Sequence, residues 1–176
     1  MRDYGTLVID EDDIYDMHKP LRLGEGLRND DIAKSLDIHI TFSFANADIE
    51  TTDYGFNQHF TDRDTLRIFK LLKRFSGCTL KEMLCQKNDE DDEGERLHLN
   101  RSNIRGNLKK AFDKLGKNVD DNNSLVYHFA LYTDQSGKAD RAKKIRSPRV
   151  YFMVGQFGIM HLLFIDFFHE INPTDY

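Results

Sequence analysis

The sequence predicts an α+β fold, in which an antiparallel sheet of about four strands carries two to three helices packed on one face. Three observations predict it. Residues 37–44 alternate apolar and polar side chains, as a half-buried strand does. Residues 61–86 and 103–115 carry apolar side chains at helical spacing. Residues 124–133 and 149–171 are expected to supply three consecutive strands, which usually pair antiparallel.

The last of these stretches is the most apolar part of the chain and is expected to form the centre of the sheet. The run Gly155-Gln-Phe-Gly158 divides it, and two apolar runs joined by a short glycine-containing turn are typical of a β-hairpin. The second run, 159–168, is almost continuously apolar, which predicts a strand covered on both faces. The glycines, Arg149 and Asp166 interrupt the stretch, so it lacks the roughly 18 apolar residues of a membrane span. No membrane is therefore expected as a partner.

Two capping boxes predict where helices begin. In Thr61-Asp-Arg-Asp64 and in Thr79-Leu-Lys-Glu82, a hydroxyl residue is followed three positions later by an acid. The first helix is expected to end at Ser76–Gly77, and the second to be short and end near Gln86. The expected apolar face of the first helix consists of Leu66, Phe69, Leu72 and Phe75.

A third helix is expected after Ser102 or Asn103, either of which can cap it. Its apolar residues keep a spacing of three to four positions, and Gly116 is suited to end it. Gly106 lies within the first turn and costs about 1 kcal/mol relative to alanine.

The chain of 176 residues is expected to fold as one α+β domain over 37–176, preceded by an arm or edge segment over 1–36. The first residues lack the pattern of a secretory signal. Cys78 and Cys85 form no disulfide or metal framework, and we expect reduced thiols that serve packing. A cytoplasmic location is the simplest interpretation.

Charge is unevenly distributed along the chain. The net charge of −5 argues against a wide nucleic-acid-binding surface, because such surfaces are usually basic. One basic connection nevertheless supplies candidate phosphate-binding residues, namely Lys138, Arg141, Lys143, Lys144 and Arg146. One acidic run supplies candidate residues for binding a basic partner, namely Asp89, Glu90, Asp91, Asp92 and Glu93. The alternative is that both are solvated segments that balance each other's charge.

No strong catalytic motif is present, and the sequence predicts no cofactor and no metal site. His39, His128 and His161 each fall within a predicted strand. If the register brings them to one face with Tyr132 and Arg149, they could act as acid–base and electrostatic groups. The alternative is that each histidine makes only local hydrogen bonds.

A second candidate cluster is Asp166-Phe-Phe-His169-Glu170, at the end of the last predicted strand. Two carboxylates and an imidazole within five residues could act as an acid–base pair or bind a metal. In an extended chain Asp166 and His169 point to opposite faces, so this requires a turn or bulge. A polar end of a strand is the plainer alternative.

The order of a strand, helices, a strand, a basic connection and a closing hairpin resembles that of the small RelE-type toxins, over residues 37–171. The resemblance implies a fold related to microbial ribonucleases and cleavage of messenger RNA on the ribosome. The positions that it implies for the site are Arg149, Tyr151, His161 and His169. This chain is longer, and it is acidic where those toxins are basic. It also resembles small uncharacterised proteins of bacterial mobile elements.

Two functions from different classes follow. The first is a small interaction protein that binds or modulates a nucleic-acid-handling partner, of a mobile-element, defence or counter-defence type. The alternative is a RelE-like endoribonuclease that cleaves RNA with histidine and arginine side chains. A homodimer formed through an exposed strand or the phenylalanine-rich hairpin is a further expectation.

Overall fold

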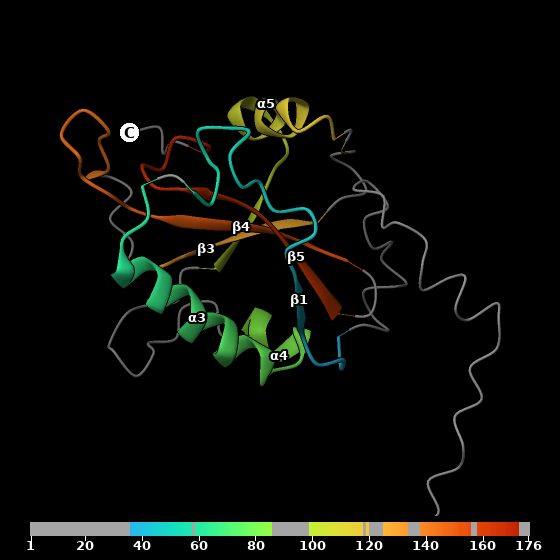
Figure 1. Ribbon diagram of the computed structural model, residues 1–176. Helices are drawn as coiled ribbons and strands as arrows, with labels where there is room; N and C mark the ends of the chain where they lie inside the picture. Colours follow the sequence, from blue (N-terminus) through green and yellow to red (C-terminus); the bar gives the residue numbers. More distant parts are fainter. Residues whose placement is uncertain are drawn as a thin grey trace, which may run out of the picture.

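The computed structural model describes residues 36–57, 59–85, 99–117, 119, 125–133, 138–155 and 158–172. Within these ranges the chain forms an open five-stranded sheet with helices, which confirms the α+β class. The elements, shown in Figure 1, are β1 (Thr41–Ser43), α3 (Asp62–Ser76), α4 (Leu80–Cys85), β2 (Leu99–Ser102), α5 (Gly106–Lys114), β3 (Val126–Ala130), β4 (Arg149–Val154) and β5 (Ile159–Asp166).

The sheet has the order β1-β5-β4-β3-β2 and is mixed. The last four strands in the chain pair antiparallel with their sequence neighbours, as the closing hairpin and the strand before it predict. β1 instead runs parallel to β5, with Phe42 opposite Met160. The sequence does not predict β2, because Leu99-Asn-Arg-Ser102 is short and contains one large apolar residue.

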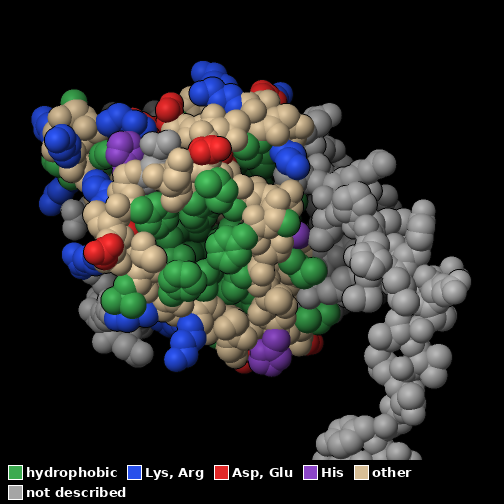
Figure 2. Space-filling view, in the orientation of Figure 1, with side chains coloured by type: hydrophobic (Ala, Val, Ile, Leu, Met, Phe, Trp, Pro, Cys, Tyr) green, Lys and Arg blue, Asp and Glu red, His purple; other side chains and the backbone are tan. Residues whose placement is uncertain are grey.

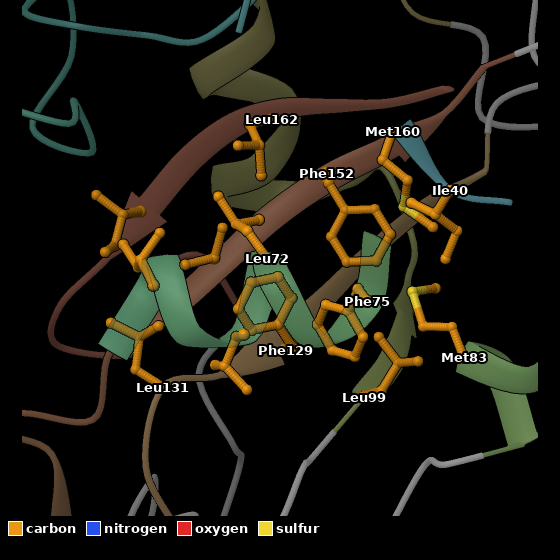
Figure 3. Close-up of a cluster of buried hydrophobic side chains, with 14 of the residues drawn as sticks. Ile40, Leu72, Phe75, Met83, Leu99, Phe129, Leu131, Phe152, Met160 and Leu162 are labelled. Carbon is orange, nitrogen blue, oxygen red and sulfur yellow. The ribbon is translucent and has the colours of Figure 1, made fainter. Parts of the chain in front are cut away.

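The main core lies between the sheet and the pair of helices α3 and α4 (Figure 3). Phe152 on β4 lies near the middle of this core, where it contacts Phe129 on β3 with a ring separation of 5.8 Å. Phe75 of α3 approaches Phe129 edge-on at 5.5 Å. Burying aromatic side chains of this size removes a large apolar area from water, which holds the two helices on the sheet.

The other face of the sheet is covered as well, so the helices do not all pack on one face as expected. α5 places Leu108, Ala111 and Phe112 against a second core. Phe112 meets Phe164 of β5 edge-on at 5.2 Å. In Figure 1, α5 and the connection from β1 to α3 lie on one side of the sheet, and the helices α3 and α4 lie on the other.

A connection without regular structure extends the edge of β5. β1 pairs only with the first residues of β5, and the backbone of the next part of β5 bonds to residues 48–54 instead. Asp48 donates its backbone N–H to Leu163 at 2.8 Å, and Ile165 donates to Tyr54 at 2.9 Å. Backbone groups of a buried strand need such partners, so this connection is held against the sheet.

The buried face of α3 agrees with the expected one at Leu72 and Phe75 but differs from it at Leu66 and Phe69. Thr61 caps the helix in the predicted capping box, but Leu66 and Phe69 are exposed. The helix buries Ile68 and Leu71, together with Arg67, whose Nε donates to the carbonyl of Leu131 at 2.6 Å. The two apolar residues first assigned to the core therefore face solvent, because the helix is rotated toward the long-range partner of Arg67.

The start of α5 is also corrected. Its N-cap is Arg105, which makes no side-chain capping bond, and the helix begins at Gly106. Ser102 belongs to β2, where its hydroxyl hydrogen-bonds to Nδ1 of His128 at 2.7 Å. The second capping box is confirmed, with Thr79 and Glu82 bonded reciprocally at the start of α4.

The expected arm over 1–36 lies outside the described residues except for Leu36. In the described part of the chain, no helix has the length and apolar character that crossing a bilayer requires.

Candidate functional site

A cavity of about 270 Å³ lies where the start of α3 meets the end of β3 and the approach to β4. Its walls come from three separate parts of the chain: Thr61, Arg63 and Asp64; Tyr132 and Thr133; and Arg146, Ser147, Pro148 and Arg149. The capping box places the first group, because it fixes the backbone of the first turn of α3.

Asp64 is the centre of a hydrogen-bond network beside this cavity. Its Oδ2 accepts from the backbone N–H of Thr61 at 2.9 Å and from the Thr61 hydroxyl at 2.7 Å. The same oxygen accepts from Nη2 of Arg146 at 2.6 Å. Oδ1 accepts from the hydroxyl of Tyr132 at 3.0 Å. Both oxygens of this buried carboxylate are therefore satisfied by protein donors.

The network shifts the acidity of two side chains. Burial by itself raises the pKa of Asp64, but the hydrogen bonds from Arg146 and Thr61 outweigh it, and the pKa lies below its usual value of 3.8. Burial and the neighbouring Asp64 carboxylate raise the pKa of Tyr132 to about 12. At neutral pH the carboxylate is charged and the phenol keeps its proton.

Three arginine residues are among those that line the cavity beside this carboxylate. Arg63 lies over the ring of Tyr132, with its Cζ 4.6 Å from the ring centre. Arg146 lies over the ring of Phe167 at 4.8 Å and also donates to the carbonyl of His59 at 3.0 Å. Arg149 is buried, and its Nη1 donates to the hydroxyl of Ser147 at 3.0 Å. Of the three arginines, only Arg63 and Arg146 keep exposed surface at the cavity.

The basic connection is largely engaged within the molecule. Arg141 makes a two-pronged pair with Glu170, at 2.8 Å from Nε and 2.6 Å from Nη2. Lys143 pairs with Asp140 at 3.0 Å, and Arg146 pairs with Asp64. Lys138 and Lys144 are exposed. The candidate phosphate-binding residues therefore do not form one basic surface, and only Arg146 belongs to the cavity.

The register of the sheet brings three of the candidate catalytic residues to one face. Arg149 lies opposite Asp166, Tyr151 opposite Phe164, and Met153 opposite His161. A bulge in β5 beside Tyr151 keeps this alternation in phase. All of these polar residues are buried, because α5 and the connection after β1 cover this face. His128 lies on the same face, beside the ring of Tyr151 at 5.1 Å.

His161 occupies a tight position near the turn of the hairpin, opposite Met153 and close to Gly155. Its Nδ1 lies 3.4 Å from the amide of Asn46, and its Nε2 is buried with no hydrogen-bond partner among the described residues. Burial lowers the pKa of this imidazole below 6.5. The imidazole of His161 is therefore neutral at neutral pH. His39 lies apart from it, in a bridge with Thr79.

The chain turns sharply after β5, which the candidate cluster at Asp166 and His169 requires. Asp166 accepts backbone N–H bonds from Phe168 at 3.1 Å and from Ile171 at 2.6 Å. His169 has a φ of 58°, in the left-handed region. Burial raises the pKa of Asp166, despite these hydrogen bonds. The two hydrogen bonds from Phe168 and Ile171 to the side chain of Asp166 hold the backbone of this turn.

Two further candidate sets remain. The acidic residues Asp89, Glu90, Asp91, Asp92 and Glu93 lie outside the described residues. Within the described ranges, no group of three histidine, cysteine, aspartate or glutamate side chains is arranged to hold a metal ion.

The cavity itself was not predicted from the sequence. Asp64 was recognised only as part of a capping box, and nothing in the local sequence relates it to Arg146, which lies 82 positions away. Arg63 carried no signal beyond its place in the first turn of a helix.

The chain matches no protein-family model, and no curated protein or solved structure is significantly similar to it. Its function is therefore inferred from its own residues.

Proposed function

We propose that this protein is a non-enzymatic interaction protein that binds a partner protein involved in handling nucleic acid. The observation that supports the proposal is a set of four exposed apolar side chains, two on α3 and two on the connection that precedes it. The most exposed large hydrophobic side chains among the described residues are Phe44 (51%), Ile49 (54%), Leu66 (58%) and Phe69 (62%). We call these four residues the apolar surface.

Partly buried aromatic side chains occur in the same segments of the chain. Phe42, Phe56 and Phe60 pack against the main core without being fully covered. Phe56 and Phe60 stack at 6.1 Å, and Phe60 meets Phe167 edge-on at 5.2 Å. Figure 2 shows hydrophobic side chains gathered in one hollowed patch on this side of the molecule, over α3, β1 and their connection. Large exposed apolar patches mark sites of protein–protein interaction.

Charge supports the choice of partner. The net charge of −5 and the acidic run at residues 89–93 repel nucleic acid and attract basic proteins. Proteins that bind nucleic acid usually carry basic surfaces. An acidic protein with an apolar contact surface is therefore suited to bind such a protein and to modulate it.

Quantitative affinity capture with the tagged full chain tests this proposal. The double variant Leu66→Ser/Phe69→Ser removes two exposed apolar side chains from one helix. Lys73→Ser changes an exposed residue of the same helix and is the matched control. The expected result is a nucleic-acid-handling protein that is captured by the wild type and by Lys73→Ser, but not by the double variant. Identical captured proteins for all three chains would contradict the proposal.

Two further measurements sharpen the result. Replacing Asp89, Glu90, Asp91, Asp92 and Glu93 by their amides is expected to weaken capture and reduce its salt dependence. Light scattering of the purified chain reports self-association. A dimer that dissociates in Leu66→Ser/Phe69→Ser would assign the apolar surface to contact between copies of this chain, against the proposal of a different partner.

The RelE-like endoribonuclease is the second candidate, and one observation favours it. The register places Arg149, Tyr151 and His161 on one face of the sheet. Because that face is covered, cleavage would require residues above it to move. A short labelled RNA, assayed for binding by anisotropy at low and moderate salt and then for cleavage on a gel, tests it. Cleavage that is lost in His161→Ala or His169→Ala would favour this function, and intact RNA with no binding would exclude it for free RNA.

A further inference from the structure

We propose that residues 7–17 of this chain bind intramolecularly to the outer face of α3. That face is formed by Leu66, Phe69 and Lys73, which lie at helical positions i, i+3 and i+7 and are all exposed. The inference goes beyond the proposed function, because it needs no partner protein. Leu66 and Phe69 take part in both proposals, so the experiment below includes a variant that separates the two.

The outer face of α3 combines apolar side chains with positive charge. Leu66 and Phe69 are exposed by 58% and 62%. Lys73 and Arg74 add two positive charges in the last turn, whereas the exposed acid Asp62 lies at the opposite end of the helix. This local charge is opposite in sign to the net charge of −5 of the whole chain. An acidic segment that also carries apolar side chains is complementary to such a face.

Residues 7–17 have this composition. The run Leu7-Val-Ile-Asp-Glu-Asp-Asp-Ile-Tyr-Asp-Met17 contains five acidic residues and no basic one, and its other six residues are apolar or aromatic. The second acidic run, residues 89–93, contains no apolar residue. Residues 7–17 lie outside the described residues, so their sequence alone defines the ligand. Because the outer face of α3 needs both apolar and acidic contacts, it favours residues 7–17 over the second run.

The described part of the chain begins beside the helix pair α3 and α4. Leu36 packs against the main core, and its carbonyl accepts from the backbone N–H of Lys81 on α4 at 2.9 Å. Figure 1 shows these first residues next to α4. Residues 18–35 can span up to roughly 60 Å when extended, and α3, with its 15 residues, is about 22 Å long. Residues 7–17 can therefore reach every part of the outer face.

The covalent connection favours this contact over binding of a separate molecule. A short tether holds a segment near its site at an effective concentration on the order of 1 mM. Each exposed ion pair contributes little by itself. The contact therefore depends on the apolar side chains for most of its strength, and the charges select which segment binds.

Fluorescence anisotropy of a labelled peptide with the sequence of residues 7–17 tests the site, with the purified full chain as the receptor. In one variant, residues 10–13, three aspartates and a glutamate, are replaced by their amides. The tethered segment should then leave the outer face, so this variant is expected to bind the peptide at least about tenfold more tightly than the wild type does.

A matched control makes the same change elsewhere in the sequence. Residues 89–92, also three aspartates and a glutamate, are replaced by their amides. This control is expected to bind the peptide as weakly as the wild type does. Equal affinity of the peptide for all three chains, or no binding to any of them, would overturn the proposal.

Substitutions on α3 in the variant with amides at residues 10–13 test the location. Leu66→Ser/Phe69→Ser is expected to abolish peptide binding, and binding that survives would overturn the site. Lys73→Ser is expected to weaken binding about two- to fivefold, as the loss of one exposed ion pair implies. It separates the two proposals, because capture of the partner protein is expected to be unchanged by it. Lys109→Ser alters an exposed lysine of α5, across the sheet, and should leave peptide binding unchanged.

Carbodiimide cross-linking of the wild type is a second readout, because this reagent joins a carboxylate to a lysine only where the two are in contact. Cross-links from residues 10–16 to Lys73 are expected in the monomer. Such cross-links only in a dimer would show that the segment binds a second copy of the chain, and would overturn intramolecular binding. Cross-links from residues 10–16 only to lysines of α5 would overturn the site.

Discussion

The guanidinium of Arg146 donates a 2.6 Å hydrogen bond to the carboxylate of Asp64, across 82 positions of sequence. The pair joins the first turn of α3 to the segment that leads into β4. Asp64 is almost completely buried, whereas the side chain of Arg146 keeps 26% exposure. The pair therefore fastens a helix start to the sheet and also forms part of the wall of the cavity.

Asp64→Asn is expected to lower the free energy of unfolding by about 2 kcal/mol. This lies between the ~1 kcal/mol of an exposed ion pair and the ~3–5 kcal/mol lost when one partner of a buried pair is removed. Chemical denaturation at pH 7 measures it. Lys143→Ala breaks an exposed pair with Asp140 and is the control, with no measurable change expected. An equal effect of both substitutions would contradict the structural role of Asp64.

The contribution of Asp64 is expected to depend on pH. Because its pKa in the folded state lies below the usual 3.8, its stabilising effect is complete above that value. The effect is lost as the pH falls through the lower pKa of the folded state. The difference in unfolding free energy between wild type and Asp64→Asn should therefore shrink between pH 5 and pH 2.

Asp166 provides the opposite case. Burial raises its pKa in the folded state, so the charged form is disfavoured there. Relative to Asp166→Asn, the wild type should gain stability as the pH falls through that raised pKa. Denaturation series of the two variants at matched pH values would show opposite slopes, and parallel slopes would refute the assignment.

Phe152→Ala is expected to lower the free energy of unfolding by about 3–5 kcal/mol, because it leaves a cavity in the main core. Phe152 is almost fully buried and contacts the rings of Tyr127 and Phe129. Phe69→Ala removes the same side chain from an exposed position of α3, and a change within about 0.5 kcal/mol is expected. Thermal and chemical unfolding of the two variants test the rotation of α3 described above.

Gly155→Ala is expected to destabilise the hairpin by about 1–3 kcal/mol, the usual effect of overpacking. A Cβ atom at this position would lie 2.6 Å from Nε2 of His161, which is buried and has little room to move.

A double-mutant cycle with His161→Ala tests the cause. In the His161→Ala background, Gly155→Ala should cost less, with a coupling energy above about 0.5 kcal/mol. Additive effects would indicate that the carbonyl of Ile159, at 3.1 Å, limits the space instead.

Local patterns in the sequence determined most of the elements. The capping boxes at Thr61 and Thr79 placed the starts of α3 and α4, because a cap depends on residues three positions apart. The glycines at 155 and 158 placed the closing hairpin. β2 was missed because its short polar sequence has no periodicity of its own, and it gains its strand conformation by pairing with β3.

Only the tertiary structure decided which side chains meet. The rotation of α3, the parallel pairing of β1 with β5 and the cover over Arg149, Tyr151 and His161 all depend on contacts between distant segments. The cavity is the clearest case, since Asp64, Tyr132 and Arg146 belong to three parts of the chain. The periodicity of apolar residues in a sequence predicts which side of a helix or strand is apolar. It does not predict which distant segment packs against that side, because this depends on long-range contacts.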